Sequence, residues 1–97
     1  MRYGIVLAPE AVAQLRLLRE PERSATQAAL ETFLRHEPAK ESKSRIKRLR
    51  GLRQPEYRLR IDQVRVYYDI VGKEVQILAI VSKASSYQWL EEKGIKL

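Results

Sequence analysis

The chain has 97 residues, a length that fits one compact domain and predicts a single domain over 1–97. Its 19 Lys and Arg side chains against 12 Asp and Glu give a formal net charge of +7, which favours a polyanionic or acidic partner. The absence of cysteine excludes disulfides and thiol catalysis, and a single histidine argues against a His-based metal site. These counts lead us to expect no metal or cofactor. No apolar run approaches the roughly 18 residues of a membrane span, so we expect a cytoplasmic protein.

The first half of the chain predicts one strand and two helices. Apolar and smaller residues alternate over 3–7, which is typical of a strand. Apolar residues three apart then predict a helix that begins near Pro9 and that Pro21 ends. A second helix with the same spacing continues to Pro38, so the pair forms a helical hairpin, and a polar connection follows over 38–44.

The second half changes to a period of two. Apolar residues alternate with mostly polar ones over 57–61 and 64–70, and a largely apolar run follows over 75–81, which together predict three strands. The connections at 62–63 and 72–73 have the length of two-residue hairpin turns, so the three strands should be antiparallel. In the last strand the alternation assigns one face to four residues: Val75, Ile77, Ala79 and Val81.

A short amphipathic segment ends the chain and predicts a helix. Ser85 or Ser86 should cap its beginning, and Gly94 should end it. The complete order is strand, helix, helix, three antiparallel strands and a short C-terminal helix. This order predicts an α+β fold in which the helical hairpin packs on one face of a small, mostly antiparallel sheet.

The turn at 62–63 fixes how the first two antiparallel strands pair. It places Arg60 opposite Arg65 and Arg58 opposite Tyr67, all on one face. The other face points toward the helices and carries Leu59, Ile61, Val64, Val66 and Tyr68. Two arginines directly opposite each other repel, so either a bound polyanion or acidic side chains from elsewhere in the chain should neutralise them.

Positive charge is concentrated around these strands. Residues 45–65 hold two acidic side chains and eight basic ones: Arg45, Lys47, Arg48, Arg50, Arg53, Arg58, Arg60 and Arg65. Such a run can be a solvated surface, but an excess of this size favours an anion-binding one. The planar guanidinium suits phosphate, and Tyr67 on the same open face could stack on an unpaired base. Together these residues predict a surface for single-stranded nucleic acid.

Other polar residues give weaker signals. Lys83 and Tyr87 follow the last strand at the edge of the arginine-rich face, where they are either functional or simply surface residues. His36 lies near the end of the second helix, where its cation would complement the helix dipole. Trp89 and Leu90 in the last helix are expected to pack against the rest of the fold. The chain has no glycine-rich phosphate loop, paired carboxylates or Ser-His-Asp set.

The stretch KRLRGLRQPEYRLRIDQVRVYYDI, followed by EVQILAIVSK, resembles the RelE/ParE superfamily of bacterial toxins. The resemblance is carried by a Leu-x-Gly segment at 49–52, Tyr-Arg-x-Arg at 57–60, Arg-Val-x-Tyr at 65–68 and the apolar strand at 75–81. The opening strand and helical hairpin also match the family's order, so the resemblance covers essentially the whole chain. It implies the toxin of a type II toxin–antitoxin system and a RelE-like fold.

In the RelE branch the resemblance implies a ribosome-dependent, metal-independent endoribonuclease that cleaves mRNA in the A site and so inhibits translation as part of a stress response. Arg58, Arg60 and Arg65 would grip the scissile phosphate, and Lys83 or Tyr87 would transfer protons. Five further residues would contact RNA: Lys47, Arg48, Arg50, Arg53 and Tyr67. Where the best-known members carry lysines on the first of these strands, this chain has arginines, which accept no proton at neutral pH.

The resemblance also implies partners. An acidic antitoxin would wrap the toxin and block its site in a toxin–antitoxin hetero-oligomer, and the ribosome with its rRNA and mRNA would be the target. The ParE branch shares the fold but poisons DNA gyrase without being an enzyme, which is the alternative function. A plain RNA-binding module is a third hypothesis. The sequence does not separate the three.

Overall fold

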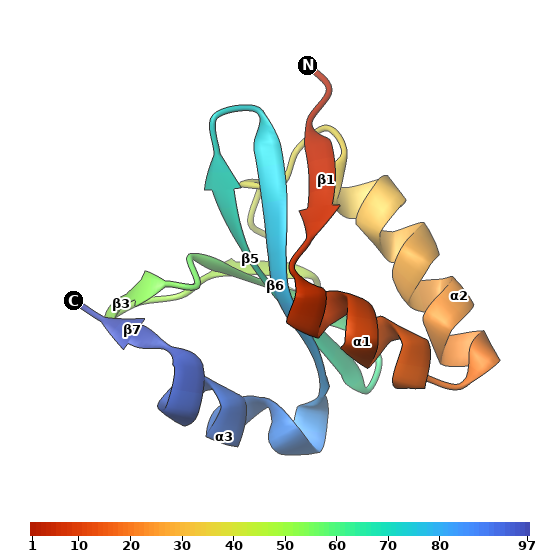
Figure 1. The fold of residues 1–97 in the computed structure, drawn as a ribbon. Coiled ribbons are helices and arrows are strands. Elements are labelled where there is room, and N and C mark those ends of the chain that lie inside the picture. The colour runs from red at the N-terminus through yellow and green to blue at the C-terminus, as the bar shows by residue number, and fades with distance from the viewer.

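A five-stranded sheet forms the centre of the fold in the computed structural model, which describes all 97 residues. The strand order is β1 (Gly4–Leu7), β6 (Glu74–Ser82), β5 (Val64–Val71), β4 (Tyr57–Ile61) and β2 (Ile46–Arg48). β1 runs parallel to β6, whereas every other neighbouring pair in this sheet is antiparallel (Figure 1). The expected α+β fold with a mostly antiparallel sheet is therefore confirmed.

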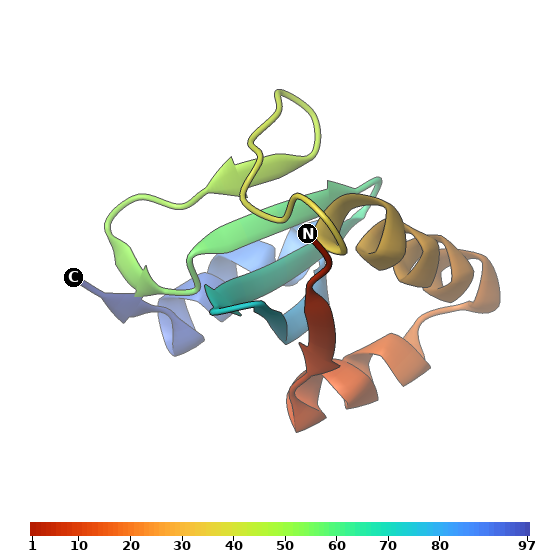
Figure 2. The ribbon, with the colours of Figure 1, turned by 90° about the horizontal axis from the view of Figure 1, so that it is seen from above.

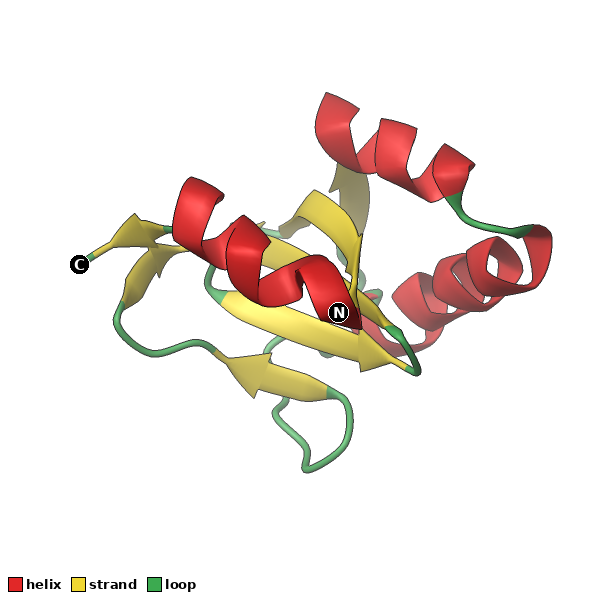
Figure 3. Ribbon diagram, turned by 90° about the horizontal axis from the view of Figure 1, so that it is seen from below, coloured by secondary structure: helices red, strands yellow, loops and turns green.

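Three α-helices pack around this sheet. α1 (Pro9–Leu17) and α2 (Glu20–Ala29) form the predicted hairpin, and a π-helical turn, η1 (Leu30–Leu34), continues α2. Pro9 occupies the first turn of α1 as expected, but Pro21 lies in the first turn of α2 rather than at the end of α1. α3 (Lys83–Lys93) lies across the sheet, apart from the hairpin (Figure 3). No helix is both long and apolar enough to span a membrane.

The main core lies between the hairpin and one face of the sheet (Figure 2). It contains Leu30 and Leu34 from the helical side and all five residues predicted to face inward: Leu59, Ile61, Val64, Val66 and Tyr68. The predicted register is also confirmed, because Arg60 pairs with Arg65 and Arg58 with Tyr67. The alternation of β4 and β5 therefore separates an apolar face from a basic one, as the sequence indicated.

Two tight turns connect the three antiparallel strands β4, β5 and β6. Asp62 adopts a φ of 49° in the β4–β5 turn, and Gly72 adopts a φ of 60° in the β5–β6 turn. Both angles lie in the left-handed region, which glycine enters freely and aspartate enters more readily than most other residues. A non-glycine residue at position 62 therefore still supports a two-residue hairpin.

The prediction for the face of β6 is wrong beyond Ile77. Tyr68 pairs with Ile77 but Tyr67 pairs with Ala79, so Leu78 is an extra residue that forms a bulge in β6. A bulge reverses the alternation of side chains. Ile80 consequently joins the main core, whereas Ala79 is buried outside it, beside Tyr67. The strand is apolar on both faces, so its pattern could not reveal the change of register.

Three short strands were not predicted. β2 pairs with β4 at the edge of the sheet, while β3 (Leu52–Gln54) and β7 (Ile95–Lys96) form a separate two-stranded sheet. β2 and most of β3 lie within the basic run over 45–53. They could not be predicted because apolar and polar residues do not alternate regularly there. The cap of α3 is Ser82 rather than Ser85 or Ser86, since the Ser82 hydroxyl accepts from the Ser85 N–H; Gly94 ends the helix as expected.

Candidate nucleic-acid interface

The face of the sheet opposite the main core carries a cluster of cations. Lys47 on β2 lies opposite Arg58 on β4, and Arg60 on β4 lies opposite Arg65 on β5. Partners in an antiparallel pair project from the same side of a sheet, so the fold brings all four together. We call Lys47, Arg58, Arg60 and Arg65 the basic face.

Arg65 is the most enclosed member of the basic face, with only 4% of the residue exposed. Its Nη1 donates to the Asp62 carbonyl over 2.7 Å and to the Val64 carbonyl over 3.1 Å, which fixes the guanidinium against the β4–β5 turn. Burial lowers the pKa of Arg65, and the neighbouring charges of Arg60 and Arg58 lower it further. Both effects disfavour the charged form of this guanidinium.

No acidic side chain neutralises the basic face. The three ion pairs of the structure join Arg23 to Glu20, Arg35 to Glu31 and Lys40 to Glu37, all within or just after the helical hairpin. The Nε of Arg58 is moreover buried without a hydrogen-bond partner, and Arg60 is exposed to solvent. Of the two explanations for the facing arginines, internal neutralisation is therefore wrong, and the unpaired charge suits an external anion.

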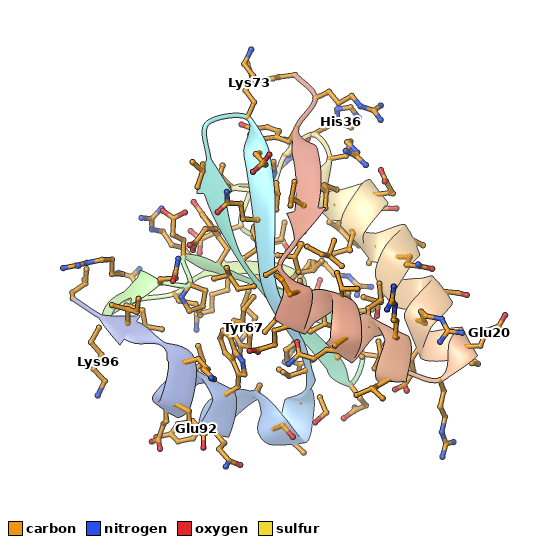
Figure 4. The ribbon with its side chains drawn as sticks, in the orientation of Figure 1. Glu20, His36, Tyr67, Lys73, Glu92 and Lys96 are labelled. Carbon is orange, nitrogen blue, oxygen red and sulfur yellow. The ribbon has the colours of Figure 1, made fainter.

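α3 covers part of the outer face, which the sequence had left open. The Tyr67 and Trp89 rings stack with centroids 5.0 Å apart and planes 9° from parallel, and Tyr67 is only 1% exposed. Figure 4 shows Tyr67 between the sheet and α3. The prediction that Tyr67 stacks on an RNA base is wrong, because α3 occupies its ring face. The prediction that Trp89 packs against the fold is confirmed.

Lys83 and Tyr87 both lie on α3 and are exposed, Tyr87 to 73%. The Lys83 N–H donates to the Gln63 carbonyl over 2.7 Å, which places the start of α3 beside the turn that holds Arg65. A hydrogen bond to Glu91, and then the charge of Glu91, raise the pKa of Tyr87. The phenol therefore keeps its proton at neutral pH and suits a proton donor rather than an acceptor.

Three basic residues predicted to contact RNA lie apart from the basic face. Arg48 pairs with Tyr57, so it belongs to the opposite face of the sheet; its Nη1 donates to the Tyr57 hydroxyl over 3.0 Å, and its guanidinium carbon lies 5.4 Å from the ring centroid. Arg50 lies in the loop after β2 and lines a separate cavity of about 360 Å³ with Arg48. Arg53 is an exposed residue of β3, outside the five-stranded sheet.

Neither the single histidine nor the acidic side chains form a metal site outside this region. His36 lies at the far end of the molecule from α3, with its Nδ1 3.1 Å from the Met1 carbonyl (Figure 4). The structure holds no group of three His, Cys, Asp or Glu side chains that could bind a metal ion. The basic face and the adjoining start of α3 therefore form the candidate site, where cationic side chains without an ion-pair partner suit an anion.

Comparisons with known proteins place this fold. No protein-family model matches the chain, and no curated protein matches it. Among solved structures, it is similar to the archaeal RelE–RelB complex of Pyrococcus horikoshii OT3, with 23% identity, a TM-score of 0.70, and coverage of 86% of this chain and 97% of that one.

Two further complexes are similar. The toxin–antitoxin complex RelBE2 of Mycobacterium tuberculosis has 21% identity and a TM-score of 0.66, and covers 84% of this chain and 99% of that one. The RelB–RelE antitoxin–toxin complex of Methanococcus jannaschii has 16% identity and a TM-score of 0.62, with coverage of 87% and 96%. The chain therefore has a RelE-like fold over most of its length, as its motifs indicated.

Proposed function

We propose that this protein is the toxin of a toxin–antitoxin pair and acts as a ribosome-dependent endoribonuclease that cleaves mRNA in the A site. The observation that carries the proposal is the basic face on a RelE-like fold: Arg58, Arg60 and Arg65 lie together without a carboxylate partner. Polyanions bind such a cluster, and a guanidinium offers two parallel donors to a phosphate. The proposed setting is the cytoplasm, where the ribosome and mRNA would be the targets.

Cleavage would use the 2′-OH of the RNA. Its oxygen forms a bond to phosphorus as the bond from phosphorus to the 5′-oxygen breaks, and one proton must leave the first oxygen while another reaches the second. Arg60 and Arg65 would stabilise the charge that develops on the phosphate. Tyr87, protonated at neutral pH, would donate to the 5′-oxygen, and Lys83 would be the second proton carrier. Both side chains are exposed and not held by the core. The ribosome would therefore have to position the mRNA against them.

The basic face also supports an acidic antitoxin as partner. The three similar structures are complexes of a toxin with an antitoxin, and a chain of net charge +7 with an unpaired cationic surface suits an acidic segment. Expression of the protein alone should arrest growth, and co-expression of the antitoxin should restore it in a hetero-oligomer. Unimpaired growth despite abundant folded protein would contradict the toxin hypothesis.

The direct test uses translating ribosomes with purified protein, followed by mapping of the mRNA ends. Wild-type protein should cut in the A site and cut naked RNA poorly. Arg60→Ala should lose about 100-fold or more in rate, the scale for removing one donor to a developing anion. Arg16→Ala removes the same charge from exposed α1 and should cut like wild type. Equal rates for the two variants would contradict the role of the basic face.

One observation favours a second function. The basic face presents arginines where a nuclease needs a proton acceptor, and arginine keeps its proton at neutral pH. A surface of this kind can bind a polyanion or a protein without chemistry, as a ParE-like poison of DNA gyrase would. Trapped gyrase–DNA complexes together with intact ribosomal mRNA would support this alternative over the nuclease.

A further inference from the structure

A contact between α1 and α3 stands outside the basic face. Trp89 Nε1 donates to the Glu10 carboxylate over 2.7 Å, although the two residues lie 79 positions apart in the chain. Gln14, one turn further along α1, donates to the same carboxylate oxygen over 3.2 Å. Two donors therefore converge on one oxygen of Glu10, which fixes the direction of its side chain.

Gln14 is itself anchored to the sheet. Its Oε1 accepts from the Ile80 N–H over 2.7 Å, two residues after the bulge at Leu78. β1 ends at Leu7, opposite Ile77, so no neighbouring strand reaches this N–H. Gln14 satisfies a backbone donor that the sheet leaves unpaired, and in doing so it ties the position of Glu10 to the centre of β6.

The other side of Trp89 rests on the outer face. Its ring stacks on Tyr67, which projects from β5 on the same side as Arg65, two residues earlier. α3 contributes no fully buried residue, and β7 beyond it pairs with β3 rather than with the five-stranded sheet. Trp89 thus joins α3 to the basic face through Tyr67 and to α1 through Glu10.

We infer that Glu10 and Trp89 form a positioning clamp that sets the direction of α3 over the basic face, and with it the place of Tyr87. The start of α3 is already fixed by the Ser82 cap and by the bond from Lys83 to Gln63. The other end of α3 is held by the pairing of β7 with β3. What the clamp adds is the place of the middle of the helix against the sheet, where Tyr87 lies two residues before Trp89. The inference rests on the proposed nuclease function and assigns Glu10 a positioning role.

The clamp can be tested without RNA, because Trp89 is the only tryptophan of the chain. In Glu10→Ala its fluorescence emission should move to longer wavelength, and acrylamide should quench it more strongly. Glu10→Gln keeps an acceptor oxygen and should restore the wild-type spectrum. Glu20→Ala is the matched control, because Glu20 also lies in the first turn of an exposed helix but does not contact α3.

Cleavage on the ribosome tests the consequence. Glu10→Ala should lower the maximal cleavage rate about tenfold or more with the half-saturating protein concentration unchanged, since a small misplacement of a reacting group costs this much. Glu10→Gln and Glu20→Ala should cleave like wild type. A normal rate in Glu10→Ala overturns the clamp, and so does a lost rate that Glu10→Gln fails to restore.

The two proposals fail in different ways. Wild-type protein that cleaves no ribosomal mRNA contradicts the proposed function, whatever the variants do. An unchanged Trp89 spectrum in Glu10→Ala contradicts the clamp even when wild-type protein cleaves normally. A spectrum that moves equally in Glu10→Ala and Glu20→Ala also overturns it, because the effect would then follow from the loss of a first-turn carboxylate alone.

Discussion

Replacing Arg65 with methionine should make the protein more stable and inactive. The Arg65 guanidinium is withdrawn from water without a carboxylate partner, beside Arg60 and Arg58, and these surroundings lower its pKa. Methionine keeps much of the apolar stem and removes the charge. The lost hydrogen bonds go to the Asp62 and Val64 carbonyls, and the exposed turn at Asp62 lets water replace the stronger one.

The net gain should be about 1 kcal/mol, the lower end for replacing buried charge by apolar side chains. For a domain of this size, that raises the melting temperature by roughly 4–8 °C in a thermal scan followed by circular dichroism. Cleavage on the ribosome should fall by about 100-fold or more. A melting temperature several degrees below wild type would refute the reasoning, because it would show that the guanidinium stabilises the turn more than its burial destabilises the fold.

Three other substitutions test the packing. Val66→Ala should lower the free energy of unfolding by about 2 kcal/mol, measured in urea, because Val66 is fully buried in the main core; a loss under half of that would contradict its place there. Tyr68→Phe removes the 2.6 Å hydrogen bond to the Pro38 carbonyl and should cost about 1–3 kcal/mol. Because burial raises the pKa of Tyr68, wild-type stability should also fall as pH rises above about 10, where only the unfolded phenol loses its proton, and Tyr68→Phe should show a shallower fall. Arg48→Ala removes the contact with Tyr57, so it should lower the melting temperature by a few degrees and change the cleavage rate less than tenfold. A larger loss of cleavage would show that Arg48 belongs to the functional site.

The helical hairpin and the β4–β5 hairpin could be predicted from the sequence because local rules decide them. Pro9 and Pro21 mark where the two helices begin, and alternation with a two-residue turn fixes the pairing of Arg60 with Arg65. β2 and the β6 bulge could not be predicted, since a basic run and a doubly apolar strand carry no period. The parallel pairing of β1 with β6 is set by packing across the whole chain.

The candidate site could likewise be predicted from the sequence only in part. Strand alternation was enough to place Arg58, Arg60 and Arg65 on one face. It could not show that α3 folds back over that face, which removes Tyr67 from solvent and brings Trp89 to Glu10. Contacts between residues so distant in sequence leave no local pattern, so exposure was the least predictable property of the site.

In the proposed reaction, the basic face holds a phosphate while the neighbouring 2′-OH attacks it. The most direct measurement uses ribosomes programmed with an mRNA that lacks this single 2′-OH in the A-site codon. Wild-type protein should cleave the unmodified message, leave a 2′,3′-cyclic phosphate, and fail to cut at the 2′-deoxy position. Cleavage at the deoxy position at the normal rate would contradict attack by the 2′-OH.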